Sequence, residues 1–180
     1  MMGLGFSDGL AALYFVVIVQ RLAELRLAAH NRVWARESGA VEYGARHYPL
    51  FIFLHTGWIV GGAAEAAWRG ARLDADWVWW VGLFCVAQPL RYWAIRSLGK
   101  RWNTRVLVFP GRVAVRSGPY RWLRHPNYVA VVLELVAVPM VFGAWYTALT
   151  ASLLNLLLLG FVRIPLENRA LDAATRNETG

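Results

Sequence analysis

The sequence has little cysteine, little lysine and few acidic residues. Its single cysteine, Cys85, lies inside an apolar run, which excludes a disulfide framework and a Cys/His metal cluster, so no metal site is predicted. Of the 19 basic residues only Lys100 is a lysine, and the 11 acidic residues leave a net charge of +8. Arginine in place of lysine, together with abundant Ala and Gly, is typical of a GC-rich genome and indicates a bacterial source.

The N-terminus also lacks the positive first segment and the small-residue cleavage site of a signal peptide, so we expect its apolar run to stay as a membrane helix. The hydrophobic share of 58% and the ten Trp are too apolar for an ordinary soluble domain and predict an integral membrane protein. The basic residues lie in loops beside apolar stretches. Contact with lipid head groups explains them better there than binding to nucleic acid.

Five apolar stretches predict an all-α fold with five transmembrane helices in a single domain, 1–180. The predicted spans cover residues 9–29, 49–68, 77–98, 127–142 and 147–164. The connection 99–125 carries seven basic residues and no acidic one, so the positive-inside rule predicts that it is cytoplasmic. The N-terminus is then outside and the C-terminus inside, and we expect the protein in a bacterial inner membrane.

The two cytoplasmic connections are predicted to hold little regular structure. Residues 30–48 are expected to form a loop with a short surface helix. In the second connection, residues 105–109 and 113–115 flank Pro110-Gly111, and this pattern predicts a short hairpin that would be marginal without packing on the helices.

Some charged or titratable side chains fall inside the predicted spans, where they need partners. Arg21 and Glu24 are three residues apart and can pair on one helix face. His55 lies deep in the second span, and one hydrogen-bond partner is enough to keep a buried histidine neutral. A structural role is favoured for these residues. The alternative is a role in a cavity for Arg21 and Glu24, and a catalytic role for His55.

The candidate functional centre is the stretch 118–128, which reads Gly-Pro-Tyr-Arg-Trp-Leu-Arg-His-Pro-Asn-Tyr. Pro126 suits the first turn of a helix, and the free N–H groups there attract an anion such as a carboxylate. Gly118 lets the backbone approach a ligand. The aromatic residues of the stretch can wall a small pocket: Tyr120, Trp122 and Tyr128. The alternative is a turn at the membrane interface, where Tyr, Trp and Arg also gather.

A second segment is predicted to meet this one at the cytoplasmic face. Spans four and five form a tight helical hairpin, so His125 at its start must be a neighbour of Arg163 and Glu167 at its end. Pro165 lies between the two charged residues and is expected to break the helix there. The alternative is a juxtamembrane cluster of charges without a ligand.

Together the segments Gly118-Pro-Tyr120, Arg124-His-Pro-Asn-Tyr128 and Arg163-Ile-Pro-Leu-Glu167 resemble the isoprenylcysteine carboxyl methyltransferase family of integral membrane methyltransferases, over residues 91–171. The resemblance implies S-adenosylmethionine as methyl donor, bound at the cytoplasmic end of the fourth and fifth helices with the C-terminal segment. The cofactor-binding residues that it implies are Gly118, Tyr120, His125, Pro126, Tyr128 and Glu167. The Rossmann motif Gly-x-Gly-x-x-Gly does not occur in the sequence.

The sequence departs from the prenylcysteine enzymes at two positions, since Ala130 and Asn168 replace a glycine and an acidic residue that those enzymes usually have. Glu134, in Val-Leu-Glu-Leu-Val, resembles a bacterial branch associated with type III polyketide synthases, which implies O-methylation of an alkylpyrone or alkylresorcinol. The alternatives are carboxyl methylation of a prenylcysteine, methylation of a lipid amine, and a non-catalytic carrier with the same fold. Each implies a lipophilic small molecule and membrane lipids as partners.

The predicted catalytic residues are Arg163, Glu134 and Glu167. Methyl transfer to oxygen is an in-line displacement at a sulfonium, so alignment and exclusion of water matter most. Arg163 can hold an acceptor that is already ionised, whereas a phenol would need a base such as Glu134 or Glu167. Glu134 needs a partner inside the membrane, and we expect Arg163 first and Asn155 second.

Overall fold

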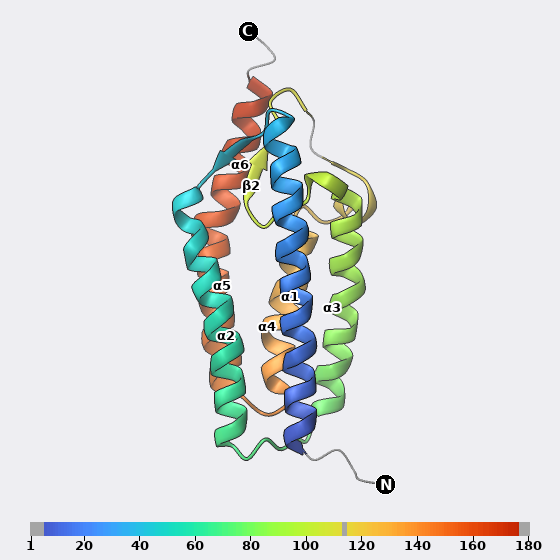
Figure 1. Cartoon of the computed structure of the whole chain (residues 1–180), viewed down its shortest axis with the longest axis vertical. Coiled ribbons are helices and arrows are strands. Elements are labelled where there is room, and N and C mark those ends of the chain that lie inside the picture. The colour runs from blue at the N-terminus through green and yellow to red at the C-terminus, as the bar shows by residue number, and fades with distance from the viewer. Residues whose placement is uncertain (1–5, 113–114, 177–180) are drawn as a thin grey trace.

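In the computed structural model, which describes residues 6–112 and 115–176, long helices stand side by side with the chain termini at opposite ends (Figure 1). A π-helical turn, Leu158–Arg163, continues the last of these helices into α6 (Ile164–Arg176). The predicted helical class is confirmed, because a helix covers each predicted apolar stretch. The bundle helices are α1 (Phe6–Glu37), α2 (Tyr48–Trp68), α3 (Trp77–Leu98), α4 (Pro126–Met140) and α5 (Trp145–Leu157).

Two helical stretches of the described chain are long and apolar enough to cross a membrane, Ala45–Trp68 and Trp145–Ala173. Helix α4 is apolar but shorter, with 15 residues. Helices α1 and α3 carry more charged residues, which lower their hydropathy. Part of that charge is turned inward, since Glu24 of α1 and Arg91 of α3 are buried in the bundle.

Helix α1 is longer than predicted and continues through residues 30–37. After Gly9 the chain has neither Gly nor Pro before Gly39, whose φ of 82° is the left-handed conformation that often ends a helix. The extension is also held in place, because Asn31 Nδ2 donates to the carbonyl of Trp102 at 2.8 Å. The loop predicted from residue 30 is therefore wrong in its first part.

Two short strands join the two connections at one end of the bundle (Figure 1). Strand β1 (Val41–Tyr43) pairs antiparallel with β2 (Val106–Val108). Val106 and Val108 are buried together with Ala170 of α6, which gives the strand pair the packing that an isolated hairpin lacks.

In the described part of the chain β2 takes its partner from the other connection rather than from a neighbouring hairpin strand. The second strand of the predicted hairpin, 113–115, falls mainly on residues 113–114, which lie outside the described residues. The side chains of β2 alternate in burial, so one face of this strand must be covered. The partner strand β1 and helix α6 together cover that face, which a turn next to β2 in the sequence would not do.

Helix α4 packs against α2, α3 and α5 and supplies much of the core. Its Pro139 has no N–H and cannot donate to the carbonyl of Leu135, four residues earlier. The indole Nε1–H of Trp58 on α2 donates to that carbonyl at 3.1 Å and replaces the missing bond. Helices α2 and α4 are therefore joined by a hydrogen bond as well as by packing.

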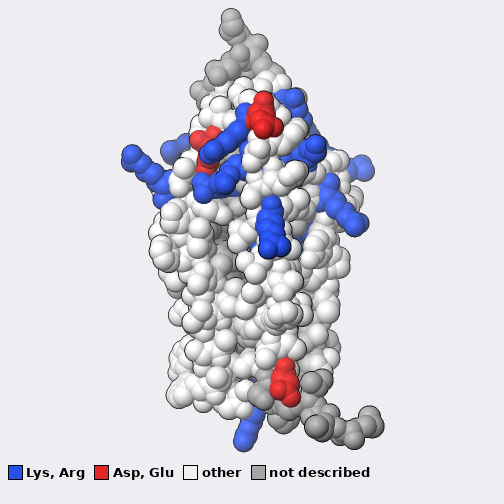
Figure 2. Space-filling model, viewed as in Figure 1, with Lys and Arg blue, Asp and Glu red and all other residues white. Residues whose placement is uncertain are grey.

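Lys and Arg gather at the end of the molecule that holds the strand pair, above a broad uncharged face (Figure 2). Glu42 on β1 pairs there with Arg36 at 2.7 Å and with Arg105 at 2.5 Å. Burial acts to raise the pKa of Glu42, but the hydrogen bonds and charges of the two arginines outweigh it and hold that pKa below its usual value. Charge pairing thus ties the strand pair to the end of α1.

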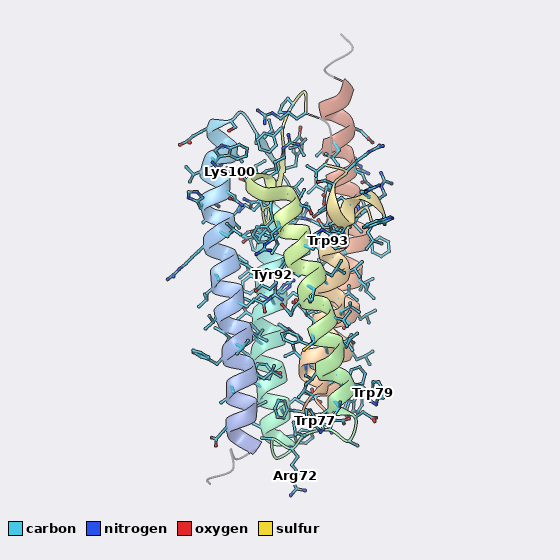
Figure 3. All side chains as sticks on the ribbon, turned by 90° about the vertical axis from the view of Figure 1, so that its right-hand side faces the viewer. Arg72, Trp77, Trp79, Tyr92, Trp93 and Lys100 are labelled. Atoms are coloured by element: carbon cyan, nitrogen blue, oxygen red, sulfur yellow. The ribbon has the colours of Figure 1, made fainter. Side chains whose placement is uncertain are left out.

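Aromatic side chains of α3 mark two levels along the bundle (Figure 3). Trp77 and Trp79 lie near the end with Arg72, whereas Trp93 lies toward Lys100. Trp79 is 77% exposed and Trp93 is 46% exposed. At 1.5 Å per residue the two rings are anchored roughly 21 Å apart along the helix. Exposed Trp at two such levels is typical of the two interfaces of a membrane.

Candidate functional site

A cavity of about 930 Å³ runs from the strand end of the molecule into the bundle. Its lining extends from β2 to Ile59 of α2 and Val131 of α4. The volume lies in the range of pockets that hold cofactors and other small molecules. The predicted site residues that line it are Tyr120, His125, Tyr128, Arg163 and Glu167.

Tyr128 is the centre of the contacts among these residues. Its hydroxyl donates to Glu167 Oε2 at 2.5 Å and accepts from Arg163 Nε at 3.0 Å. The His125 ring stacks on the Tyr128 ring with centroids 5.1 Å apart, and its Nδ1 lies 4.0 Å from Glu167 Oε1. The predicted meeting of the two distant segments is therefore observed.

Arg163 and Glu167 approach Tyr128 from one continuous helical path. The predicted break at Pro165 is wrong, because the chain passes through the π-helical turn Leu158–Arg163 directly into α6. Pro165 has no N–H to donate, and a proline is tolerated in the first turn of a helix, where that donor would be unused. The π turn ends just before this position, and such turns are frequent at functional sites.

Two residues that no motif predicted complete this end of the site. Arg163 Nη2 donates to the carbonyl of Thr104 at 3.0 Å, and Thr104 Oγ1 lies 3.2 Å from the hydroxyl of Tyr48. The guanidinium of Arg105 lies 4.0 Å from the centre of the Tyr48 ring. No spacing in the sequence relates Tyr48 to Thr104. Strand β1 comes just before Tyr48 and strand β2 just after Thr104, so the pairing of β1 with β2 brings these two residues together.

Gly118, Trp122 and Pro126, which were predicted to shape the site, do not line the cavity. Gly118 has a φ of 57° and packs on α3, where a Cβ would come 2.0 Å from Ser97 Oγ, so this glycine serves close packing rather than approach to a ligand. Pro126 is fully buried as the first residue of α4. Trp122 is 70% exposed and packs against Trp93, so its predicted place in the pocket wall is wrong.

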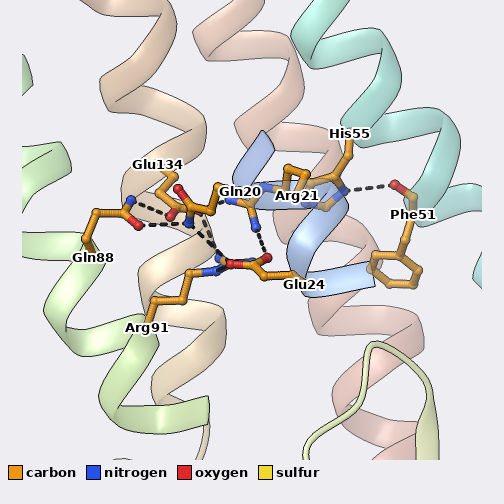
Figure 4. Close-up of polar contacts among 8 residues, drawn as sticks. All are labelled: Gln20, Arg21, Glu24, Phe51, His55, Gln88, Arg91 and Glu134. Carbon is orange, nitrogen blue, oxygen red and sulfur yellow. Dashed lines mark hydrogen bonds and ion pairs between the residues drawn. The ribbon is translucent and has the colours of Figure 1, made fainter. Parts of the chain in front are cut away.

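Glu134 belongs to a second polar cluster, deeper in the bundle (Figure 4). It is only 1% exposed and accepts a hydrogen bond from Arg21 Nη2. It also accepts from Arg91 Nη1 at 2.9 Å and from Gln88 Nε2 at 2.7 Å. The carboxylate is thus saturated by donors from α1 and α3.

Arg163 and Asn155 were predicted as the partners of Glu134, and both predictions are wrong. Arg163 is engaged at Tyr128, and Asn155 is buried with neither side-chain atom hydrogen-bonded among the described residues. The prediction considered only the hairpin of α4 and α5, whereas the donors come from helices that pack on the other faces of α4. Glu134 therefore joins neither Arg163 nor Glu167 in one site, and it does not line the cavity.

Glu24 is the second carboxylate of the deep cluster. It accepts from Arg21 Nη1 at 2.8 Å, so the predicted pair of Arg21 and Glu24 is confirmed. It also accepts from Arg91 Nε at 2.5 Å and Arg91 Nη2 at 2.6 Å. Each glutamate is bonded to both arginines, and the four charges sum to zero. A buried ionic group needs such pairing and hydrogen bonding to be tolerated.

Comparison with known proteins gives a family and two bacterial relatives. Residues 80–173 match the family described as Isoprenylcysteine carboxyl methyltransferase (ICMT) family, and this stretch contains the Tyr128 centre. The uncharacterized protein YpbQ of Bacillus subtilis is 40% identical over 160 residues, which cover 87% of this chain and 93% of that protein. An uncharacterized protein of Haemophilus influenzae is 24% identical over 157 residues, 87% of this chain and 91% of that protein. No solved structure matches.

Proposed function

The chain belongs to the isoprenylcysteine carboxyl methyltransferase family, whose members are membrane-embedded methyltransferases that use S-adenosylmethionine, and on this premise we propose that it methylates an oxygen of a lipophilic acceptor. The observation that carries the proposal is the cluster of His125, Tyr128, Arg163 and Glu167 in a cavity that reaches from the basic end of the molecule into the apolar bundle. Such a cavity offers polar side chains to a cofactor at its outer end, and both apolar side chains and charged groups of the bundle to a lipid with a polar head further in.

The chemistry of the lining fits the parts of S-adenosylmethionine, which supplies a methyl group on a positive sulfur when bound. Glu167 offers a carboxylate to an ammonium group or to ribose hydroxyls. The stacked rings of His125 and Tyr128 offer an aromatic face to a cation. Burial raises the pKa of the Tyr120 hydroxyl, which stays neutral and able to donate a hydrogen bond. Arginines of the loop that line the cavity complement a carboxylate: Arg112, Arg116, Arg121 and Arg124.

For the acceptor we propose an alkylpyrone or an alkylresorcinol, made by an enzyme of the type III polyketide synthase class. Leu22 of α1 and Ile52 of α2 line the cavity and are also 54% and 48% exposed, so the cavity opens between these helices where a long alkyl tail can extend. The polar cluster at the inner end suits a hydroxylated ring. If neither of these acceptors is methylated, three alternatives remain. The acceptor is then a prenylcysteine carboxylate or a lipid amine, or the protein is a carrier without catalysis.

We also propose that α1 to α5 all span a bacterial inner membrane, with the site on the cytoplasmic side. The basic end and the uncharged face in Figure 2 and the two aromatic levels in Figure 3 support this arrangement. Helices α1 and α3 fall short in hydropathy partly because of Arg21, Glu24 and Arg91, and these charges are paired within the bundle. Paired interior charges are compatible with a membrane span.

Cysteine labelling in intact cells tests this topology. In a Cys85→Ala background, we expect Pro110→Cys to react with an impermeant maleimide only after the membrane is opened, because the uncompensated arginines favour the cytoplasm. Arg72→Cys, at the opposite end of the bundle, should react from outside and serves as the matched control. Labelling of position 110 in intact cells would contradict the orientation.

Calorimetry on the protein in detergent tests cofactor binding. The wild type should bind S-adenosylhomocysteine, and His125→Ala should weaken binding by about tenfold, since a lost contact between an aromatic ring and the ammonium group of the ligand is worth about 1–2 kcal/mol. His30→Ala, at an exposed position of α1 away from the cavity, should bind like the wild type. A wild type that binds neither this ligand nor S-adenosylmethionine would remove the enzyme proposal and leave the carrier.

A further inference from the structure

His55 of α2 presents an unprotonated nitrogen to the cavity. Its Nδ1 lies 2.8 Å from the carbonyl oxygen of Phe51, and a carbonyl can only accept, so Nδ1 carries the hydrogen. A neutral imidazole then keeps a lone pair on Nε2, the position of a base. His55 lines the cavity, and no hydrogen bond to its Nε2 is observed among the described residues.

Arg21 of α1 lines the same part of the cavity but offers no accessible free donor there. Its two terminal nitrogens bond to Glu24 and Glu134, while its Nε is buried without a hydrogen-bond partner in the described part of the chain. Arg21 lines the same cavity as His55. Figure 4 draws the His55 ring beside Arg21. Arg21 therefore contributes positive charge to the inner part of the cavity, while the free lone pair there belongs to His55.

The carboxylates predicted as bases are occupied. Glu134 accepts three hydrogen bonds and does not line the cavity, and Glu167 accepts from Tyr128 at the outer end. Glu24 is bonded to both arginines of the deep cluster. His125 is at the outer end as well, stacked on Tyr128. None of these groups combines a free lone pair with a place in the inner half of the cavity.

The position of His55 relative to the outer site fits a reaction between the two. The guanidinium of Arg163 lies 5.8 Å from the Phe51 ring, and His55 is one helical turn further into the bundle. One turn of an α-helix advances about 5.4 Å, so His55 is anchored that much deeper along α2 than Phe51, on the side of the acceptor rather than of the outer cluster.

We propose that His55 is the general base of this enzyme and that it selects a hydroxylated ring as acceptor. The inference rests on the methyl transfer proposed above. The O–H bond of the acceptor breaks and its proton goes to His55 Nε2. The oxygen electron pair forms the new carbon–oxygen bond while the carbon–sulfur bond breaks with its electrons on sulfur. The proton then leaves to solvent through the cavity.

The need for a base depends on the acidity of the acceptor, which gives a test. A resorcinol is a phenol and resembles tyrosine, with a pKa of about 10, so its proton must be removed during the reaction. A 4-hydroxypyrone is a vinylogous carboxylic acid and is already ionised near neutral pH. Removing the base should therefore slow the first acceptor much more than the second.

The experiment compares His55→Gln with the wild type on a pentadecyl resorcinol and a pentadecyl hydroxypyrone, at saturating S-adenosylmethionine. Glutamine can accept a hydrogen bond but is not basic. We expect kcat for the resorcinol to fall by about 10²- to 10⁴-fold, the usual contribution of general acid–base catalysis, and kcat for the pyrone to change by less than about threefold. The Kd for S-adenosylhomocysteine should stay at the wild-type value, which also reports an intact fold. His30→Gln, at an exposed histidine outside the cavity, is the matched control.

An equal loss on both acceptors would make His55 a structural residue, and an unchanged rate on the resorcinol would show that no base is needed there. Either result overturns the inference while the proposed function stands. A wild type that methylates the pyrone alone would overturn it too. A wild type that neither binds the cofactor nor methylates either acceptor would overturn the proposed function itself.

Discussion

Replacing Glu134 by Gln should lower the free energy of unfolding by about 3–5 kcal/mol, the cost of breaking a buried ion pair by removing one partner. Glu134 is 1% exposed, and its loss leaves the network of Arg21, Arg91 and Glu24 with one uncompensated positive charge. Unfolding of the purified protein in mixed micelles, followed by tryptophan fluorescence, measures the change. A Glu134→Gln protein that keeps the wild-type stability but loses turnover would contradict this structural role.

Two controls separate charge from packing. Glu37→Gln, at the exposed end of α1, should change the unfolding free energy by no more than about 0.5 kcal/mol. The double variant Glu134→Gln, Arg21→Gln restores neutrality and should be more stable than Glu134→Gln alone. If the double variant loses as much stability, relative to the wild type, as the two single variants lose together, then Glu134 and Arg21 are not energetically coupled.

Replacing Arg163 by Gln should lower kcat for methyl transfer by about 10²- to 10³-fold, the usual loss when one preorganised donor at a reacting centre is removed. Arg163 holds the hydroxyl of Tyr128 at 3.0 Å and the carbonyl of Thr104 at 3.0 Å, and it lines the cavity. Its loss should disturb the ring of Tyr128 and remove the positive charge nearest to that hydroxyl. Initial rates with radiolabelled donor measure the effect.

Arg169→Gln is the matched control, because Arg169 is exposed and lies on α6 two residues beyond Glu167. We expect it to keep its rate within about twofold, as surface substitutions away from special features have small effects. Equal rates for Arg163→Gln and the wild type would remove Arg163 from the site. A melting temperature far below that of the wild type would assign the loss to the fold instead.

The helices and the meeting of two distant segments could be predicted because they follow from local rules. Long apolar runs gave the places of α1 to α5, and the short turn between α4 and α5 forces the residues at the start of one helix to lie beside those at the end of the other. His125, Tyr128, Arg163 and Glu167 were therefore brought together correctly from the sequence.

The parts that failed depend on which faces of the helices meet. Glu134 accepts hydrogen bonds from side chains of α1 and α3, and no residue spacing in the sequence predicts that those helices pack beside α4. The pairing of β1 with β2 joins segments about 65 residues apart, whereas the predicted hairpin used only neighbouring residues. The break expected at Pro165 did not occur, because a π-helical turn places the proline at the start of a new helix.

We propose that this chain transfers a methyl group from S-adenosylmethionine to a lipid oxygen at the cluster around Tyr128. The direct measurement is transfer of a radiolabelled methyl group by the purified protein in lipid nanodiscs to a pentadecyl resorcinol or hydroxypyrone, with the product extracted into organic solvent and identified by mass spectrometry. We expect a methyl ether that forms in proportion to wild-type protein and falls by about 10²-fold or more with Arg163→Gln. No labelled product from either acceptor, with a protein that is folded in the nanodisc, would contradict it.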